Sequence, residues 1–220
     1  MNNNNQSTES AAKSADGRAS VTFGPRCSEP LSRSELLSWL RSDSAAGSGR
    51  SKKILLHCSD TWPSANFTIE KLAASHRARG FGQWPGYHFY VTRDGTIYYC
   101  RPIGVRGCHA KGYNEGSIGV CYEGGRKEEC KGWHRKGSSC ELCGQRGCHC
   151  PKGLRVMSPW EDNRTAEQVV ALHELLTTLH EIWPNAQLLG HRDLPGVRKA
   201  CPCLDTRREY GYLRGMRVEG

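Results

Sequence analysis

Three short apolar runs stand out in the hydrophobic pattern of the chain. They cover residues 53–58, 117–122 and 186–189, and polar or glycine-rich sequence follows each of them. Apolar runs of this length, bounded by turn residues, predict strands. The first run is nearly continuous, as in a strand that is buried on both faces of its sheet.

A hairpin and two helices are predicted from local signals. Residues 87–92 and 96–100 flank Asp94-Gly95, which favours a tight turn between two antiparallel strands. Ser32-Arg33-Ser34-Glu35 is a capping box ahead of a short apolar helix. Residues 68–80 read as a second helix, which begins at a threonine cap and ends at a glycine.

The longest predicted helix begins at Thr165, where Gln168 completes a capping box, and Pro184 stops it. His173 and His180 lie seven residues apart on one of its faces, and we interpret both as structural or solvent-facing. The helical spacing predicts a buried stripe of apolar residues. Its members are Val169, Leu172, Leu176, Leu179 and Trp183, widened by Leu175 and Ile182.

Strands and helices that follow one another in this way predict an α/β fold, with a central mixed β-sheet flanked by helices. A length of 220 residues suits a single well-buried domain with additions. We expect a disordered tail that is rich in Asn and Ser, a short helix with a linker, the main domain with a cysteine-rich insertion, and a C-terminal tail. These parts are 1–25, 26–52, 53–210 with the insertion at 126–160, and 211–220.

Three side chains near the ends of these runs are candidate metal ligands. His57 closes the first apolar run and His191 follows the last one, where open α/β sheets place their sites. A single histidine there is more often structural, but two of them with Cys201 nearby form a zinc-ligating set. Such a set leaves one coordination position open for water, as in catalytic zinc sites.

Six segments resemble, in order and approximate spacing, the zinc-dependent N-acetylmuramoyl-L-alanine amidases of the phage-lysozyme type, which are related to the peptidoglycan recognition proteins. The resemblance covers about residues 53–125 and 165–205. The segments are His57-Cys58-Ser59-Asp60-Thr61, Gly86-Tyr87-His88-Phe89, Arg93-Asp94-Gly95-Thr96, His109-Ala110-Lys111-Gly112-Tyr113-Asn114, Ser117-Ile118-Gly119-Val120-Cys121 and Lys199-Ala200-Cys201-Pro202.

The resemblance implies roles for particular residues. His57, His191 and Cys201 match the zinc ligands, and Lys199 matches the lysine that stabilises the oxyanion. Tyr87 matches the tyrosine that faces the metal and assists proton transfer or holds the attacking water. The segment that contains His109 resembles the wall of the substrate groove, so His109 is a candidate substrate contact. Two further candidates for glycan or peptide contacts are Asn114 and Trp62.

One position separates two branches of the family. The branch that recycles wall fragments has a glutamate as general base where this chain has Cys121, so the chain resembles the phage lysozymes more closely. Glu123 would lie on the same strand face as Cys121, which leaves a displaced base conceivable. Cys58 and Cys121 can also be explained as small buried apolar groups.

The stretch between the two matching parts is rich in cysteine and basic residues. Cys140 and Cys143 have the spacing of a zinc knuckle, and Cys148 with Cys150 would complete a second, structural zinc site. Disulfides or reduced thiols are the alternatives for these cysteines.

Net charge and composition limit the partners. The net charge of +9 would suit a polyanion or simply aid solubility, but no nucleic-acid-binding motif is present. No apolar run approaches the roughly 20 residues of a membrane helix, and the first residues lack the features of a secretory signal. We therefore expect a monomer that is made in the cytoplasm and acts on the cell wall after release or export.

The sequence thus predicts a zinc amidase that cleaves peptidoglycan between N-acetylmuramic acid and L-alanine, used as a phage or prophage endolysin. A non-catalytic peptidoglycan-binding module is the alternative, although the complete set of site residues speaks against it. A secreted antibacterial effector and a regulatory partner of a phage polymerase also remain open.

Overall fold

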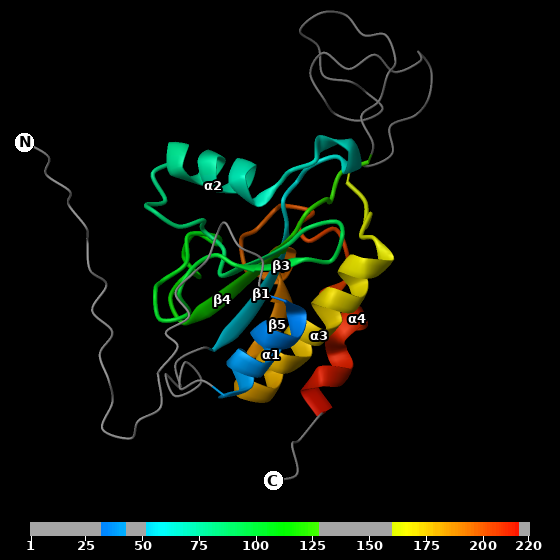
Figure 1. Ribbon diagram of the computed structural model, residues 1–220. Helices are drawn as coiled ribbons and strands as arrows, with labels where there is room; N and C mark the ends of the chain where they lie inside the picture. The colour runs from blue at the N-terminus through cyan, green and yellow to red at the C-terminus, as the bar shows by residue number, and fades with distance from the viewer. Residues whose placement is uncertain (1–31, 43–51, 128–159, 216–220) are drawn as a thin grey trace, which may run out of the picture.

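A five-stranded mixed sheet forms the centre of the computed structural model, which describes residues 32–42, 52–127 and 160–215. The strand order is β3-β2-β4-β1-β5, and Figure 1 shows β1 between β4 and β5. Strands β2 and β3 are antiparallel, and the other neighbouring strands are parallel. The predicted α/β fold is confirmed. The strands are β1 Lys53–Cys58, β2 Phe89–Val91, β3 Ile97–Tyr99, β4 Ser117–Tyr122 and β5 Gln187–Gly190.

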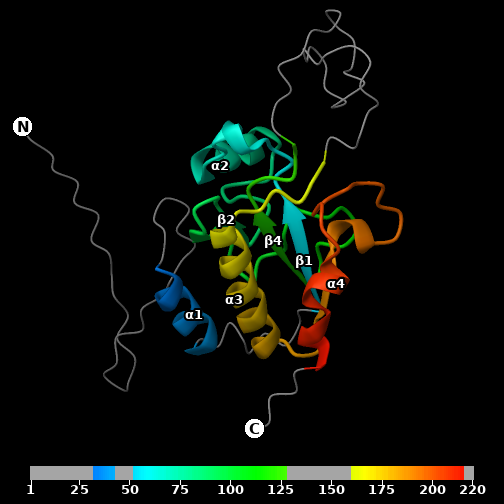
Figure 2. The same ribbon diagram turned by 90° about the vertical axis from the view of Figure 1, so that its right-hand side faces the viewer.

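Helices cover both faces of this sheet. Helix α3 lies between α1 and α4 on one face (Figure 2), and its apolar side chains share a core with α1 and with β1, β2 and β4. Helix α2 packs on the opposite face, against Tyr90 of β2 and Cys121 of β4. The helices are α1 Arg33–Ser42, α2 Ile69–Ala78, α3 Ala166–Ile182 and α4 Thr206–Tyr210, with the short 3-10 helices η2 Pro63–Ala65, η3 His191–Asp193 and η4 Gly211–Gly215.

The side chains of β1 alternate between the two faces. Ile54, Leu56 and Cys58 belong to the core beneath α1 and α3, whereas Leu55 packs on the opposite face. His57 follows the same alternation as Leu55. All of these side chains are buried, as predicted for a strand that is covered on both sides. The ladder therefore places the His57 ring at the carboxyl end of β1, on the face away from α3.

The predicted helix caps are confirmed. Thr165 and Gln168 form a reciprocal capping box at α3, and the Thr68 hydroxyl accepts a hydrogen bond from the amide of Lys71 at α2. The prediction that Val169 is buried is wrong, because 37% of its surface is exposed. Gln168 is buried there instead, and its amide group donates to the carbonyls of Val91 and Glu123. The buried face of α3 therefore includes a polar residue, which donates hydrogen bonds to two backbone carbonyl groups of adjacent segments.

Several predicted segments lie wholly or partly outside the described residues. These are the tail at 1–25, the linker after α1 and the insertion after residue 127. The short helix α1 is docked on the domain, because Leu36 and Leu40 are buried in the main core. Ordered structure also continues past residue 210, since Leu213 of η4 is buried. None of the helices in the described ranges has the length and apolar character needed to span a membrane.

Candidate metal centre

The two candidate histidines come together because β1 and β5 are parallel neighbours. His57 lies near the end of β1, and His191 begins η3 directly after β5. The carboxyl ends of parallel strands meet at one edge of a sheet, so the two imidazoles face each other there. Their ring centroids are 4.6 Å apart.

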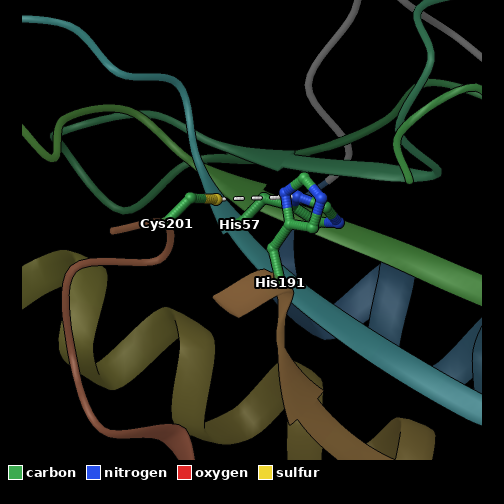
Figure 3. Close-up of side chains that lie close together, drawn as sticks. All are labelled: His57, His191 and Cys201. Carbon is green, nitrogen blue, oxygen red and sulfur yellow. Dashed lines mark hydrogen bonds between the residues drawn. The ribbon is translucent and has the colours of Figure 1, made fainter. Parts of the chain in front are cut away.

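Cys201 reaches the same point from the loop after η3. Its Sγ atom lies 3.7 Å from Nδ1 of His57, and the backbone amide of Cys58 donates to this sulfur at 3.3 Å. The ligand atoms of His57, His191 and Cys201 all lie within 4.8 Å of one another. Figure 3 shows the Cys201 sulfur pointing toward the two rings.

The donor set fits zinc in kind and in spacing. Zinc binds imidazole nitrogen at about 2.0–2.1 Å and thiolate sulfur at about 2.3 Å, so its ligand atoms lie about 3–4 Å apart in a tetrahedral site. Burial lowers the pKa of His57 well below its usual value, and the nearby His109, His191 and Lys199 lower it further. Burial and Lys199 also lower the pKa of His191. Both rings are therefore neutral at physiological pH, which is the form that binds a metal.

His109 stands directly behind His57. Its Nδ1 atom lies 3.1 Å from Nε2 of His57, the nitrogen on the far side of the ring from the Cys201 sulfur. The His109 ring fits against two glycines, because a Cβ atom at Gly107 or Gly119 would lie within 2.6 Å of it. Its own Nε2 is buried and has no hydrogen-bond partner among the described residues.

A cleft of about 480 Å³ opens above these residues. The catalytic candidates Tyr87 and Lys199 line it together with the candidate ligands His191 and Cys201. Burial raises the pKa of Tyr87 well above its usual value, and the nearby thiols of Cys121 and Cys201 raise it further. The Tyr87 hydroxyl therefore remains protonated and able to donate a hydrogen bond.

The family model of the N-acetylmuramoyl-L-alanine amidases matches residues 47–203. The chain belongs to this amidase family. The endolysins of Escherichia phage T7 and Enterobacteria phage T3 are each 33% identical over 155 residues, which covers 70% of this chain and 82% of each relative. The chain is thus a peptidoglycan amidase related to these phage enzymes, as the sequence motifs predicted.

A solved amidase structure has the same fold. The N-acetylmuramoyl-L-alanine amidase endolysin LysCS of Clostridium intestinale URNW superposes with a TM-score of 0.50 and 23% identity. The superposition covers 74% of this chain and 84% of LysCS. At this level of identity the likeness supports the fold alone.

Asn114 and Trp62, the remaining contact candidates of this amidase, do not line the cleft beside the candidate ligands. Asn114 accepts hydrogen bonds from the backbone amides of His109 and Ala110 at 2.9 and 2.8 Å, so it shapes the loop that carries His109. It also lines a second hollow beside the cleft. The Trp62 ring lies 5.6 Å from the guanidinium carbon of Arg126.

Several residues of the cleft wall were not predicted from the sequence, and three of them, Trp160, Arg79 and Arg198, are suited to contact substrate. Trp160 is 41% exposed, and its ring nitrogen donates to Asp60 at 3.0 Å, which fixes the indole at the rim. Arg79 and Arg198 bring positive charge to the same cleft. None of the three belongs to a matched motif, so only the folded arrangement reveals them.

Glu123 and Cys121, the two residues considered at the general-base position, both lie in buried surroundings. One Glu123 oxygen accepts the backbone amide of Phe67 at 2.6 Å, and the other accepts that of Arg93 at 3.3 Å. This carboxylate therefore ties two loops to β4. Burial raises the pKa of Cys121 well above its usual value, so the thiol stays neutral beside Tyr87.

The candidate ligands of the second zinc site, Cys140, Cys143, Cys148 and Cys150, lie outside the described residues. Among the described residues, His57, His191 and Cys201 form the one group with the spacing of a metal site.

Proposed function

We propose that this amidase hydrolyses the amide bond between N-acetylmuramic acid and L-alanine with one zinc ion held by His57, His191 and Cys201. The observation that carries the proposal is the convergence of these two imidazoles and one thiol beside a cleft that His191 and Cys201 line. Bound zinc would polarise the substrate carbonyl and lower the pKa of a bound water. The similarity to the T7 and T3 endolysins supports a lytic role against the bacterial wall.

Two side chains of the cleft are suited to the charge changes of amide hydrolysis. The Lys199 ammonium would donate to the oxygen that becomes negative as water adds to the carbonyl. The Tyr87 hydroxyl, which stays protonated, would hold the attacking water or donate to the substrate. Trp160 and Arg198, which both line the cleft, would contact the glycan or the peptide of the substrate.

Digestion of purified peptidoglycan with and without a zinc chelator tests the proposal. We expect the zinc-loaded protein to release stem peptides with a free L-alanine amino group, detected by mass spectrometry. The chelator should abolish this release, and added zinc should restore it. Binding to peptidoglycan without release in the zinc-loaded state would instead support the non-catalytic alternative.

His109 is proposed to position His57, in addition to the substrate contact that the motif indicates. Because Nδ1 of His57 faces Cys201, Nε2 of His57 carries the proton. This N–H group donates a hydrogen bond to Nδ1 of His109. Metal-bound histidines commonly use such a bond to fix the ring and its tautomer. Removing the acceptor should weaken zinc binding by about 10–100-fold.

Two substitutions separate positioning from substrate contact. His109→Ala removes the acceptor, whereas the side-chain carbonyl of His109→Asn can occupy nearly the position of Nδ1. We expect weaker zinc binding in the alanine variant and near-normal binding in the asparagine variant, measured by competition with a chromophoric chelator. If both variants bound zinc normally and only KM rose, His109 would act through substrate alone.

A further inference from the structure

Three sulfur atoms meet at the carboxyl end of β1. Cys201 provides the proposed zinc ligand, since its Sγ atom lies 3.7 Å from Nδ1 of His57. The Sγ atoms of Cys58 and Cys203 lie 3.6 Å apart, in direct contact. Both are free thiols. The site thus has one sulfur for the metal and a pair of thiols beside it with no role in the proposed chemistry.

The chain encloses this pair closely. Cys58 is buried at the wall of the cleft, and Cys203 is half-buried. The carbonyl of Gly125 accepts a hydrogen bond from the Cys203 thiol at 3.2 Å. A Cβ atom at Gly125 would lie only 2.5 Å from the Cys58 sulfur, so the backbone itself covers the pair.

The backbone of Cys203 is also unusual. Its φ angle is +69°, in the left-handed region that non-glycine residues rarely adopt. A glycine or asparagine would fit this position with less strain. A cysteine in this backbone conformation, in contact with a second thiol, indicates that its side chain has a function.

We propose that Cys58 and Cys203 form a disulfide when the protein leaves the reducing cytosol. This proposal rests on the proposed action of the protein at the cell wall. A low-molecular-weight disulfide is the oxidant. One of the two cysteines attacks it as the thiolate and releases one thiol, and the other cysteine then displaces the second as the Cys58–Cys203 bond forms. The two protein thiols lose two hydrogens in total, and the oxidant becomes two thiols. Cys201 is not consumed.

The bond would join the two chain segments that carry the zinc ligands. Cys58 follows His57 directly, and Cys203 lies two residues after Cys201. The two cysteines are 145 positions apart in the sequence, so their bond would close a long loop in the unfolded chain. Closing a loop of this size stabilises the folded state, and here it would hold the Cys201 loop against β1.

Oxidation of the zinc-loaded full chain with oxidised glutathione tests the proposal. After the remaining thiols are alkylated, trypsin should yield peptide 54–71 linked to peptide 200–207. Because Cys201 and Cys203 share the second peptide, fragmentation must locate the bond at Cys203. We expect bound zinc to be retained and Tm to rise by about 5–10 °C.

Cys203→Ser is the matched control, because it removes one partner and keeps the size of the side chain. This variant should bind zinc normally but show neither the linked peptide nor the rise in Tm. A linkage from Cys58 to Cys201 with loss of zinc would overturn the proposal, and so would reduced Cys58 and Cys203 after prolonged oxidation. These readouts do not depend on activity, so they remain informative if peptidoglycan is not the substrate.

Discussion

Replacing Cys201 with serine should remove both zinc and amidase activity. In the proposed site the Cys201 thiolate is one of three protein ligands, and a serine hydroxyl is a poor zinc ligand at neutral pH. Loss of a residue that only supports a ligand costs about 10–100-fold in metal affinity, so loss of the ligand itself should cost more than about 100-fold. Zinc content and release of stem peptides from peptidoglycan measure the two effects.

Cys203→Ser is the control for this experiment. It makes the same chemical change two residues away, but the Cys203 sulfur faces Cys58 and Gly125 rather than the histidines. We expect it to retain zinc and activity under reducing conditions. The midpoint of urea unfolding, measured with zinc removed, should be similar for both variants. A Cys201→Ser protein that keeps a full complement of zinc would refute the ligand assignment.

The sequence predicted the centre of this site because its ligands follow the ends of predicted strands. His57 and His191 each come after a short apolar run, and parallel pairing of β1 with β5 brings such positions together. The pairing itself could not be deduced, because the apolar runs carry no information about which strands are neighbours. Cys201 was a candidate because a thiol near two such histidines suits zinc, and the motif resemblance matched it to a ligand, although its loop has no regular periodicity.

The surroundings of the ligands were less predictable for physical reasons. The His57–His109 hydrogen bond depends on a loop that packs the His109 ring against Gly107 and Gly119. The spacing of residues along the sequence does not predict such contacts. The burial of Gln168 in place of Val169 likewise follows from two carbonyls that need a donor. At that position the need of two backbone carbonyl groups for a hydrogen-bond donor outweighed the helical spacing of apolar residues.

Replacing Lys199 with methionine should reduce kcat while leaving zinc in place. Lys199 lines the cleft beside His191 and Cys201, and it forms no ion pair with another described residue. Its positive charge lowers the pKa of both histidines, in keeping with its place in the same cleft. Loss of a donor to the oxyanion should lower kcat by about 10²–10³-fold.

Further variants show whether this effect comes from the position of the charge. Lys199→Arg keeps a cation at the cleft and should recover part of kcat, limited by the different shape of the guanidinium. Arg207→Met removes one exposed positive charge from α4 and should leave kcat unchanged. Because zinc binding does not use the lysine, all three variants should contain as much zinc as the unaltered protein. If Lys199→Met instead raised KM alone, Lys199 would act in substrate binding, since an interaction made only in the transition state changes kcat.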